Sequence, residues 1–231
     1  MTIIEFKNSK DITIEFENGY ILKGRYPEFK TGEIKYPYDK RVYNIGYHGV
    51  GEYKVSINQK HTKQYNYWYD MLKRCYCQEY IVEHATYAEK IVCDEWHNFQ
   101  TFAKWFDDNY YEIEGDRIEL DKDILFRGNN IYSPETCTFI PKRINTLFLK
   151  CDASRGNTPI GVDEKNGRFM ARCNTFRNRV TLGSYSTAEE AFNSYKIFKE
   201  KYIKEVADLY RNVISKDIYE AMYRYEVRIT D

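Results

Sequence analysis

The stretch from residue 154 to residue 210 decides the fold of the C-terminal part of this chain. It reads RGNTPIGV at 155–162, GRFMARCN at 167–174, RVTLGSYS at 179–186 and TAEEAFNSYKIFKEKYIKEVADLY at 187–210. The first three segments are short, alternate between apolar and polar residues, and are separated by turn residues, which predicts three strands. The fourth has helical spacing, and Ser186 with Glu189 predicts a capping box at its start. We therefore expect a three-stranded sheet packed on one long helix.

Arginine recurs in this stretch at the spacing of a strand. Because successive side chains of a strand point to opposite faces, Arg168 and Arg172 would share one face of the second strand. Arg177, Arg179 and Thr181 have the matching parity on the third strand. Such a face suits the major groove of DNA, about 12 Å wide, where arginine pairs with guanine through two parallel hydrogen bonds. The predicted DNA-binding residues are Arg155, Arg168, Arg172, Arg177, Arg179 and Thr181.

The charge of the chain is balanced overall but uneven along its length. The 231 residues include 35 basic and 35 acidic ones, so the whole molecule is not a simple polycation. Between Cys151 and Gly183, however, six basic residues occur with three acidic ones. This local surplus of positive charge falls where a groove-binding face would need it. Double-stranded DNA is therefore the expected partner.

Nothing in the sequence indicates a membrane partner. No apolar run approaches the ~20 residues that cross a bilayer. The first ten residues, MTIIEFKNSK, lack the basic and apolar regions of a signal peptide. A composition of 42% hydrophobic and 30% charged residues is that of an ordinary soluble protein. We expect a cytoplasmic protein.

The N-terminal half changes from strand to helix patterns. Residues 11–26 alternate around Asn18-Gly19, which predicts a β-hairpin within a small β unit of residues 1–58. From Thr62 the apolar period becomes helical, and a second helical pattern begins near Asp94. The first helical stripe comprises Trp68, Met71, Leu72 and Cys75.

Residues 117–148 predict two strands and a helix. Ile118 and Leu120 indicate the first strand, RGNN at 127–130 a hairpin turn, and residues 138–140 the return strand. Pro141 fits the first turn of a short helix. The expected fold class is α+β: an N-terminal β unit (1–58), a central helical and ββα region (59–150), a C-terminal sheet on one helix (151–214) and a tail (215–231).

Several of these segments resemble known families. LDKDILFRGNNIYSPETCTFIPKRIN at 120–145 is similar to the HNH-type (His-Me finger) endonuclease segment of bacteriophage proteins, and WYDMLKRCYC at 68–77 resembles their helical lead-in. PIGV at 159–162, GRFMAR at 167–172, LGSY at 182–185 and TAEEAFNSYK at 187–196 resemble the ethylene-response-factor (Apetala) type DNA-binding domain. The resemblance implies a phage-type, metal-dependent DNA endonuclease of homing or nicking type, with Mg²⁺ or Mn²⁺ as cofactor.

The chemistry of a His-Me finger assigns roles to several residues. In that family a histidine activates water, and an aspartate with an asparagine or histidine holds one divalent metal that offsets charge developing on the phosphate. The resemblance therefore implies Asp121 and Asn145 as metal ligands. Asn129 or Asn130 matches the asparagine that steadies the loop between the strands.

The chain departs from the family at the general base, where Lys122 occupies the histidine position. Lysine is charged near pH 7 unless it is strongly desolvated, so Asp123, or His97 from the preceding helix, is an alternative base. The candidate catalytic residues are Lys122, Asp123, His97 and Asn130. Without a base, the same fold would be a catalytically inactive DNA-binding regulator or a phage counter-defence protein. A protein-interaction module, whose tyrosine-rich surface binds a host protein, is a third alternative.

The six cysteines include no CxxC pair. In a cytosolic chain such cysteines are expected to be reduced and to pack as small apolar residues. A structural zinc site from Cys75, Cys77 and Cys93 with His84 or Cys137 is an alternative, although the spacing is irregular.

Overall fold

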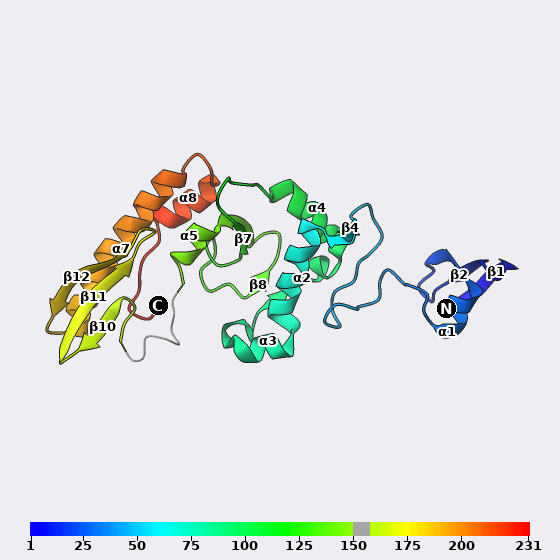
Figure 1. Cartoon of the computed structure of the whole chain (residues 1–231), viewed down its shortest axis with the longest axis horizontal. Coiled ribbons are helices and arrows are strands. Elements are labelled where there is room, and N and C mark those ends of the chain that lie inside the picture. The colour runs from blue at the N-terminus through cyan, green and yellow to red at the C-terminus, as the bar shows by residue number, and fades with distance from the viewer. Residues whose placement is uncertain (150–157) are drawn as a thin grey trace.

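The computed structural model describes residues 1–149 and 158–231. It is a mixed α+β structure of several small sheets and helices, which confirms the expected class. The N-terminal sheet lies at one end of the molecule and the C-terminal sheet at the other, with the central helices between them (Figure 1). Arg155, one of the predicted DNA-binding residues, lies outside the described residues.

A three-stranded antiparallel sheet forms the N-terminal end. It comprises β1 (Thr2–Asn8), β2 (Asp11–Glu15) and β3 (Ile21–Gly24) in that order, and α1 (Tyr26–Thr31) follows. Ile12 and Ile14 alternate along β2 and are buried with Ile34 in a core of their own. The pairing of β2 with β3 confirms the predicted hairpin around Asn18-Gly19.

The rest of the predicted N-terminal β unit packs on the central region. Val42 is buried in the central core, and Tyr43, Ile45, Tyr53 and Val55 pack against that core. β4 (Ser56–Ile57) and β5 (Lys60–His61) pair as a short antiparallel hairpin. Residues 1–58 thus contribute one small sheet and one segment that extends the central region.

Two helices form the middle of the molecule. Thr62 caps α2 (Lys63–Tyr76), and the predicted stripe of α2 is buried. The second helix begins later than predicted: Asp94–His97 form a 3-10 turn, η2, and α4 (Phe99–Asn109) starts after Asn98, whose side chain accepts a hydrogen bond from the Gln100 N–H. The connecting elements are α3 (Gln78–Glu83), η1 (Ala85–Tyr87) and β6 (Ile91–Val92).

The predicted strand, strand and helix occur in the expected order. β7 (Ile118–Asp121) pairs antiparallel with β9 (Thr138–Pro141), and α5 (Lys142–Thr146) follows. The prediction that residues 127–130 form a simple hairpin turn is wrong. The connection runs from residue 122 to residue 137 and contains β8 (Ile131–Tyr132), which pairs parallel with β6. The connection is longer than a hairpin turn because it includes β8, whose partner β6 lies outside the β7–β9 pair.

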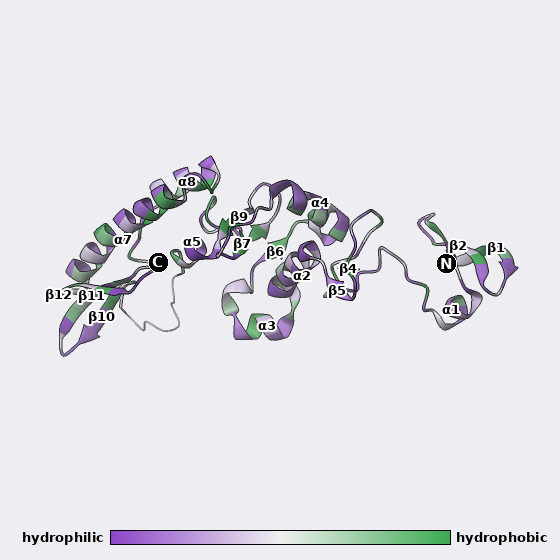
Figure 2. Ribbon diagram, turned by 45° about the horizontal axis from the view of Figure 1, so that its top comes forward, coloured by the Kyte–Doolittle hydropathy of each residue, from purple (hydrophilic) through white to green (hydrophobic). Residues whose placement is uncertain are grey.

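The C-terminal part contains the predicted sheet and helix. β10 (Val162–Lys165), β11 (Arg168–Asn174) and β12 (Arg179–Tyr185) form an antiparallel sheet in that order. α7 (Ala188–Tyr210) packs against the sheet, and its ribbon alternates between purple and green in Figure 2, as an amphipathic helix should. Its capping box is Thr187 with Glu190, one residue later than predicted.

A second core joins the C-terminal helices to the ββα segment. Ile140 and Ile144, from β9 and α5, are buried with Ile203 and Val206 of α7 and with Ile218 of α8 (Lys216–Tyr223). The predicted regions 59–150 and 151–214 therefore share apolar packing where α7 passes the ββα segment.

Candidate functional site

Four of the predicted DNA-binding residues lie on one face of the C-terminal sheet. Ala171 and Cys173 are buried against α7, so the alternate positions Arg168 and Arg172 project from the other face of β11. Arg172 lies opposite Thr181 in the register, and Arg179 lies opposite Asn174. The outer face, meaning the face of this sheet turned away from α7, thus presents Arg168, Arg172, Arg179 and Thr181.

Arg177 is not on a strand, contrary to the prediction. β12 begins at Arg179, and Arg177 is an exposed residue of the turn that joins β11 to β12. The Thr175 hydroxyl accepts hydrogen bonds from the backbone N–H groups of Arg177 and Asn178, which closes this turn. Arg177 therefore extends the basic surface at its end and not within the outer face.

Sequence reasoning missed one residue of the outer face, Asp163. Oδ2 of Asp163 accepts a hydrogen bond of 2.8 Å from Arg172 Nη1 and another of 2.8 Å from Arg179 Nη2. Asp163 pairs with Met170 in the register, which places it on the outer face. Predicting this from the sequence would have required knowing how β10 pairs with β11. Together with Lys165 and Arg168, which lie opposite each other at the end of β10, the outer face has more basic than acidic groups.

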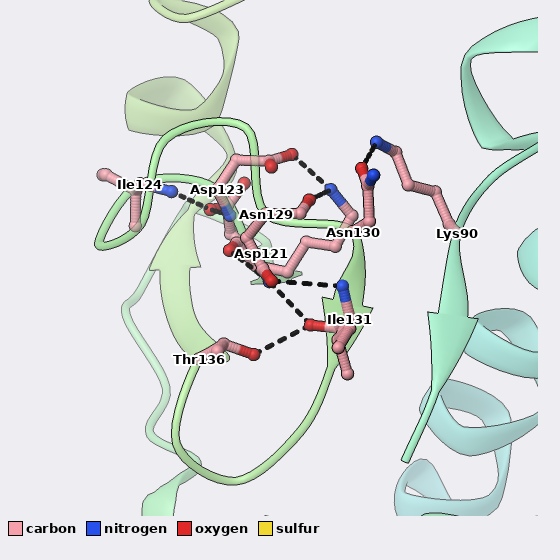
Figure 3. A network of polar contacts seen from close by, with 9 residues as sticks. Lys90, Asp121, Asp123, Ile124, Asn129, Asn130, Ile131 and Thr136 are labelled. Atoms are coloured by element: carbon pink, nitrogen blue, oxygen red, sulfur yellow. Dashed lines mark hydrogen bonds and ion pairs between the residues drawn. The ribbon is translucent and has the colours of Figure 1, made fainter.

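The second candidate site is the loop that follows β7 (Figure 3). Oδ1 of Asp121 accepts hydrogen bonds from the backbone N–H groups of Asp123, at 2.8 Å, and Ile124, at 2.7 Å. Burial raises the pKa of the Asp121 carboxyl above its ordinary value, although these two hydrogen bonds act against the rise. Asp121 therefore folds the start of the loop with one oxygen.

Lys122 is buried inside this loop, with only 4% of its surface exposed. Its ammonium group donates to the Asp123 carboxylate at 2.6 Å and to the Asn129 carbonyl at 2.8 Å, and it lies 5.7 Å from the centre of the Tyr132 ring. An ammonium group so bonded has no lone pair with which to accept a proton. Lys122 acts here as a structural cation, and Asp123 is its counter-ion.

The two asparagines of the loop have different contacts. The Asn129 amide donates to the carbonyls of Lys122 and Ile131, and its oxygen accepts from the Ile131 N–H. Asn129 thus steadies the loop between the strands. The Asn130 side-chain oxygen accepts instead from the ammonium group of Lys90, on the segment that leads into β6 (Figure 3).

Asn145 and His97 are not joined to this loop by a hydrogen bond in the part of the chain that the structure describes. Asn145 lies on α5, which follows Pro141, the partner of Ile118 in the register, whereas Asp121 pairs with Thr138 at the other end of β7. His97 lies in η2, where Nδ1 is 3.6 Å from Asp94 Oδ1. The structure therefore brings Asp121, Lys122, Asp123 and Asn129 together, with Asn130 beside them.

Within residues 1–149 and 158–231, no group of three or more His, Cys, Asp or Glu side chains is arranged to hold a metal ion. The cysteines considered for zinc are free thiols. Burial raises the pKa of both Cys75 and Cys137 to about 12, so both are protonated thiols when no metal is bound.

Two partly buried histidines predict how stability depends on pH. Nε2 of His48 and of His97 are buried and have no hydrogen-bond partner among the described residues, and burial lowers the pKa of both imidazoles below 6.5. A histidine whose pKa is lowered in the folded state contributes stability above pH 6.5, and this stability is lost as pH falls through the folded-state pKa. We expect the free energy of unfolding to fall between about pH 7 and pH 5.

Denaturant titrations at several pH values test this expectation. His48→Gln and His97→Gln should each flatten the dependence, whereas His61→Gln, which alters an exposed imidazole, should not. Equal slopes for all three variants would contradict the assignment to the two partly buried histidines.

Asp121 allows a second prediction about stability. Because the pKa of Asp121 is raised in the folded state, the protonated carboxyl stabilises the fold at low pH. This stabilisation is lost as pH rises through the folded-state pKa, so the ionised carboxylate destabilises the fold at pH 7. Asp121→Asn keeps an oxygen for the two N–H groups and should raise Tm by about 2–4 °C at pH 7. Asp123→Asn should lower Tm, because it removes the counter-ion of buried Lys122. Thermal melts in which Asp121→Asn lowers Tm would contradict this account.

No protein-family model, curated protein or solved structure matches this chain. None of the described helices is long and apolar enough to cross a membrane. The class of protein is therefore inferred from the two sites above.

Proposed function

We propose that this chain binds double-stranded DNA through the outer face of the β10–β12 sheet. The observation that carries the proposal is that guanidinium groups from two neighbouring strands, Arg172 on β11 and Arg179 on β12, project together from the face opposite α7. Arg168 and Thr181 lie on the same face. A small sheet of this kind fits the major groove, where arginine can bind both phosphates and the edge of guanine.

The salt dependence of binding tests the proposal. Each phosphate contact releases a counter-ion, which contributes about −0.9 to the slope of log K against log salt concentration. If Lys165, Arg168, Arg172 and Arg179 each contact a phosphate, the slope for a labelled duplex followed by fluorescence anisotropy should be about −3.6. Absent binding, or a slope near zero, would reject DNA and favour a protein partner.

A second candidate function is metal-dependent hydrolysis of a phosphodiester at Asp121. The observation that favours it is a partly buried carboxylate at the end of β7 in a strand, strand and helix order, with only Oδ1 used by the hydrogen bonds given above. Asp121 and Asn145 offer the oxygen ligands that Mg²⁺ prefers, and Mg²⁺ commonly takes one or two protein carboxylates with water and phosphate. Such a metal would offset negative charge on the phosphate.

The loop fits this second function only in part. Asp121 offers an oxygen, but no hydrogen bond among the described residues joins it to Asn145, and Lys122 supplies a cation where a base is needed. We therefore propose DNA binding as the principal function and hydrolysis as an activity that this loop supports weakly. A plasmid-nicking assay with Mg²⁺ or Mn²⁺, comparing the wild type with Asp121→Ala, distinguishes the two.

A further inference from the structure

One carboxylate holds two arginines together on the outer face. Asp163 is on β10, Arg172 on the central strand β11 and Arg179 on β12, so the ion pairs span the whole sheet. Both guanidinium groups donate to the same oxygen, Oδ2, at 2.8 Å. One terminal nitrogen of each guanidinium group is therefore held next to that of the other arginine.

All three side chains remain accessible to a ligand. The side chains of Arg172, Asp163 and Arg179 are 29%, 44% and 55% exposed. Asp163 takes one terminal nitrogen of each arginine. The other terminal nitrogen of Arg172, Nη2, donates to the Met170 sulfur at 3.6 Å, and Arg172 Nε is buried. Arg179 keeps Nε and Nη1 unbonded to other described residues, so Arg179 has the free edge of the pair. An arginine held along one edge loses less rotamer freedom when its free edge binds a ligand.

A carboxylate in this position opposes binding that depends on charge alone. It removes one positive charge from the centre of the outer face and repels phosphate. It also fixes the direction of the two guanidinium groups, and direction matters for pairing with a base edge far more than for neutralising a phosphate. The arrangement therefore suits recognition of particular bases.

We infer that Asp163 is a positioning residue for sequence-specific recognition, which presents Arg172 and Arg179 as a pair to neighbouring base pairs. This inference rests on the proposed function. Asp163 does not itself touch DNA in this account. It lowers the affinity for DNA of arbitrary sequence and raises the preference for a site with guanines at the two arginine positions.

The experiment compares two dissociation constants at one fixed salt concentration. The wild type first selects a duplex from a randomised pool, and Kd is then measured for that duplex and for a scrambled duplex of the same composition. Asp163→Asn is expected to bind the scrambled duplex more tightly. Its specificity ratio, Kd for the scrambled duplex over Kd for the selected duplex, should fall by about tenfold, the usual effect of one lost base contact.

Two further variants separate charge from position. Glu164→Gln changes the charge equally at the exposed neighbouring residue, and its ratio should equal that of the wild type. Asp163→Glu keeps the charge but moves the carboxylate by one methylene group, so its ratio should fall without tighter binding of the scrambled duplex. Because Asp163 is a surface residue, these substitutions should leave Tm close to that of the wild type.

The outcomes distinguish the inference from the proposed function. A wild type that binds no duplex rejects both. A wild type that binds and selects a sequence supports the function, and an Asp163→Asn ratio within about twofold of the wild-type ratio would then overturn the role of Asp163 alone. A ratio that falls equally in Glu164→Gln would also overturn it, because local charge and not position would be responsible.

Discussion

The double substitution Arg172→Ala and Arg179→Ala is expected to weaken duplex binding by about a hundredfold. Each arginine can contribute about 1–3 kcal/mol when it pairs with a base, and the two lie on one face within reach of a single carboxylate. The slope of log K against log salt concentration should also become less steep by about one for each arginine that contacts a phosphate. Anisotropy titrations at several salt concentrations measure both quantities.

Two controls define what the double variant reports. Arg224→Ala removes an exposed arginine that pairs with Glu220 at the end of α8, and it should leave affinity and slope unchanged. Adding Asp163→Asn to the double variant removes the carboxylate left without partners and should recover part of the affinity. A double variant that binds duplex as tightly as the wild type, with the same slope, would contradict the assignment of the outer face.

The second large effect is a gain of activity. Lys122→His is expected to raise Mg²⁺-dependent plasmid nicking by about a hundredfold or more, the usual contribution of a positioned general base. The Lys122 ammonium donates to the Asn129 carbonyl at 2.8 Å. An imidazole at this position can donate one N–H to the same carbonyl and keep its other nitrogen free to accept a proton from water.

Matched variants test whether the base is what the loop lacks. Lys122→Met fills a similar volume without a base and should show no gain. Adding Asp121→Asn to Lys122→His should abolish the gain, because the candidate metal ligand is lost. A folded Lys122→His variant that nicks no more than the wild type would contradict the view that the missing general base limits hydrolysis, and would favour DNA binding without hydrolysis.

Features that depend on neighbours in the sequence were predicted well. The alternation of Ile12 and Ile14, the buried stripe of α2 and the two faces of β11 follow from local periodicity. The start of α7 was predicted one residue too early, because Ser186 and Thr187 are both good N-cap residues. Thr187 replaces Ser186 as the N-cap of α7 because its hydroxyl accepts from the Glu190 N–H while the Glu190 carboxylate accepts from the Thr187 N–H.

Features that depend on distant contacts could not be predicted. Asp163 on β10 contacts Arg179 on β12 across the central strand β11. Predicting this contact requires knowing how all three strands pair. Lys122 is buried because Asp123 and Asn129 surround its ammonium group, although lysine is rarely buried. Leu209 lies three residues after the buried Val206, the spacing of one helix face, yet it is 73% exposed. Near it, α7 leaves the sheet and packs on α5 and α8 instead, using Ile203 and Val206.

The central claim is that duplex DNA contacts the outer face of the C-terminal sheet. Methyl NMR during titration with a duplex tests it directly, because Met170 and Thr181 lie on that face, Leu182 packs toward α7, and Ile12 and Ile14 are buried in the N-terminal sheet. DNA bound to the outer face should cause large, saturable shifts of the Met170 and Thr181 methyl signals and small shifts for Leu182, Ile12 and Ile14. Shifts confined to the N-terminal isoleucines, or none at saturating duplex, would contradict it.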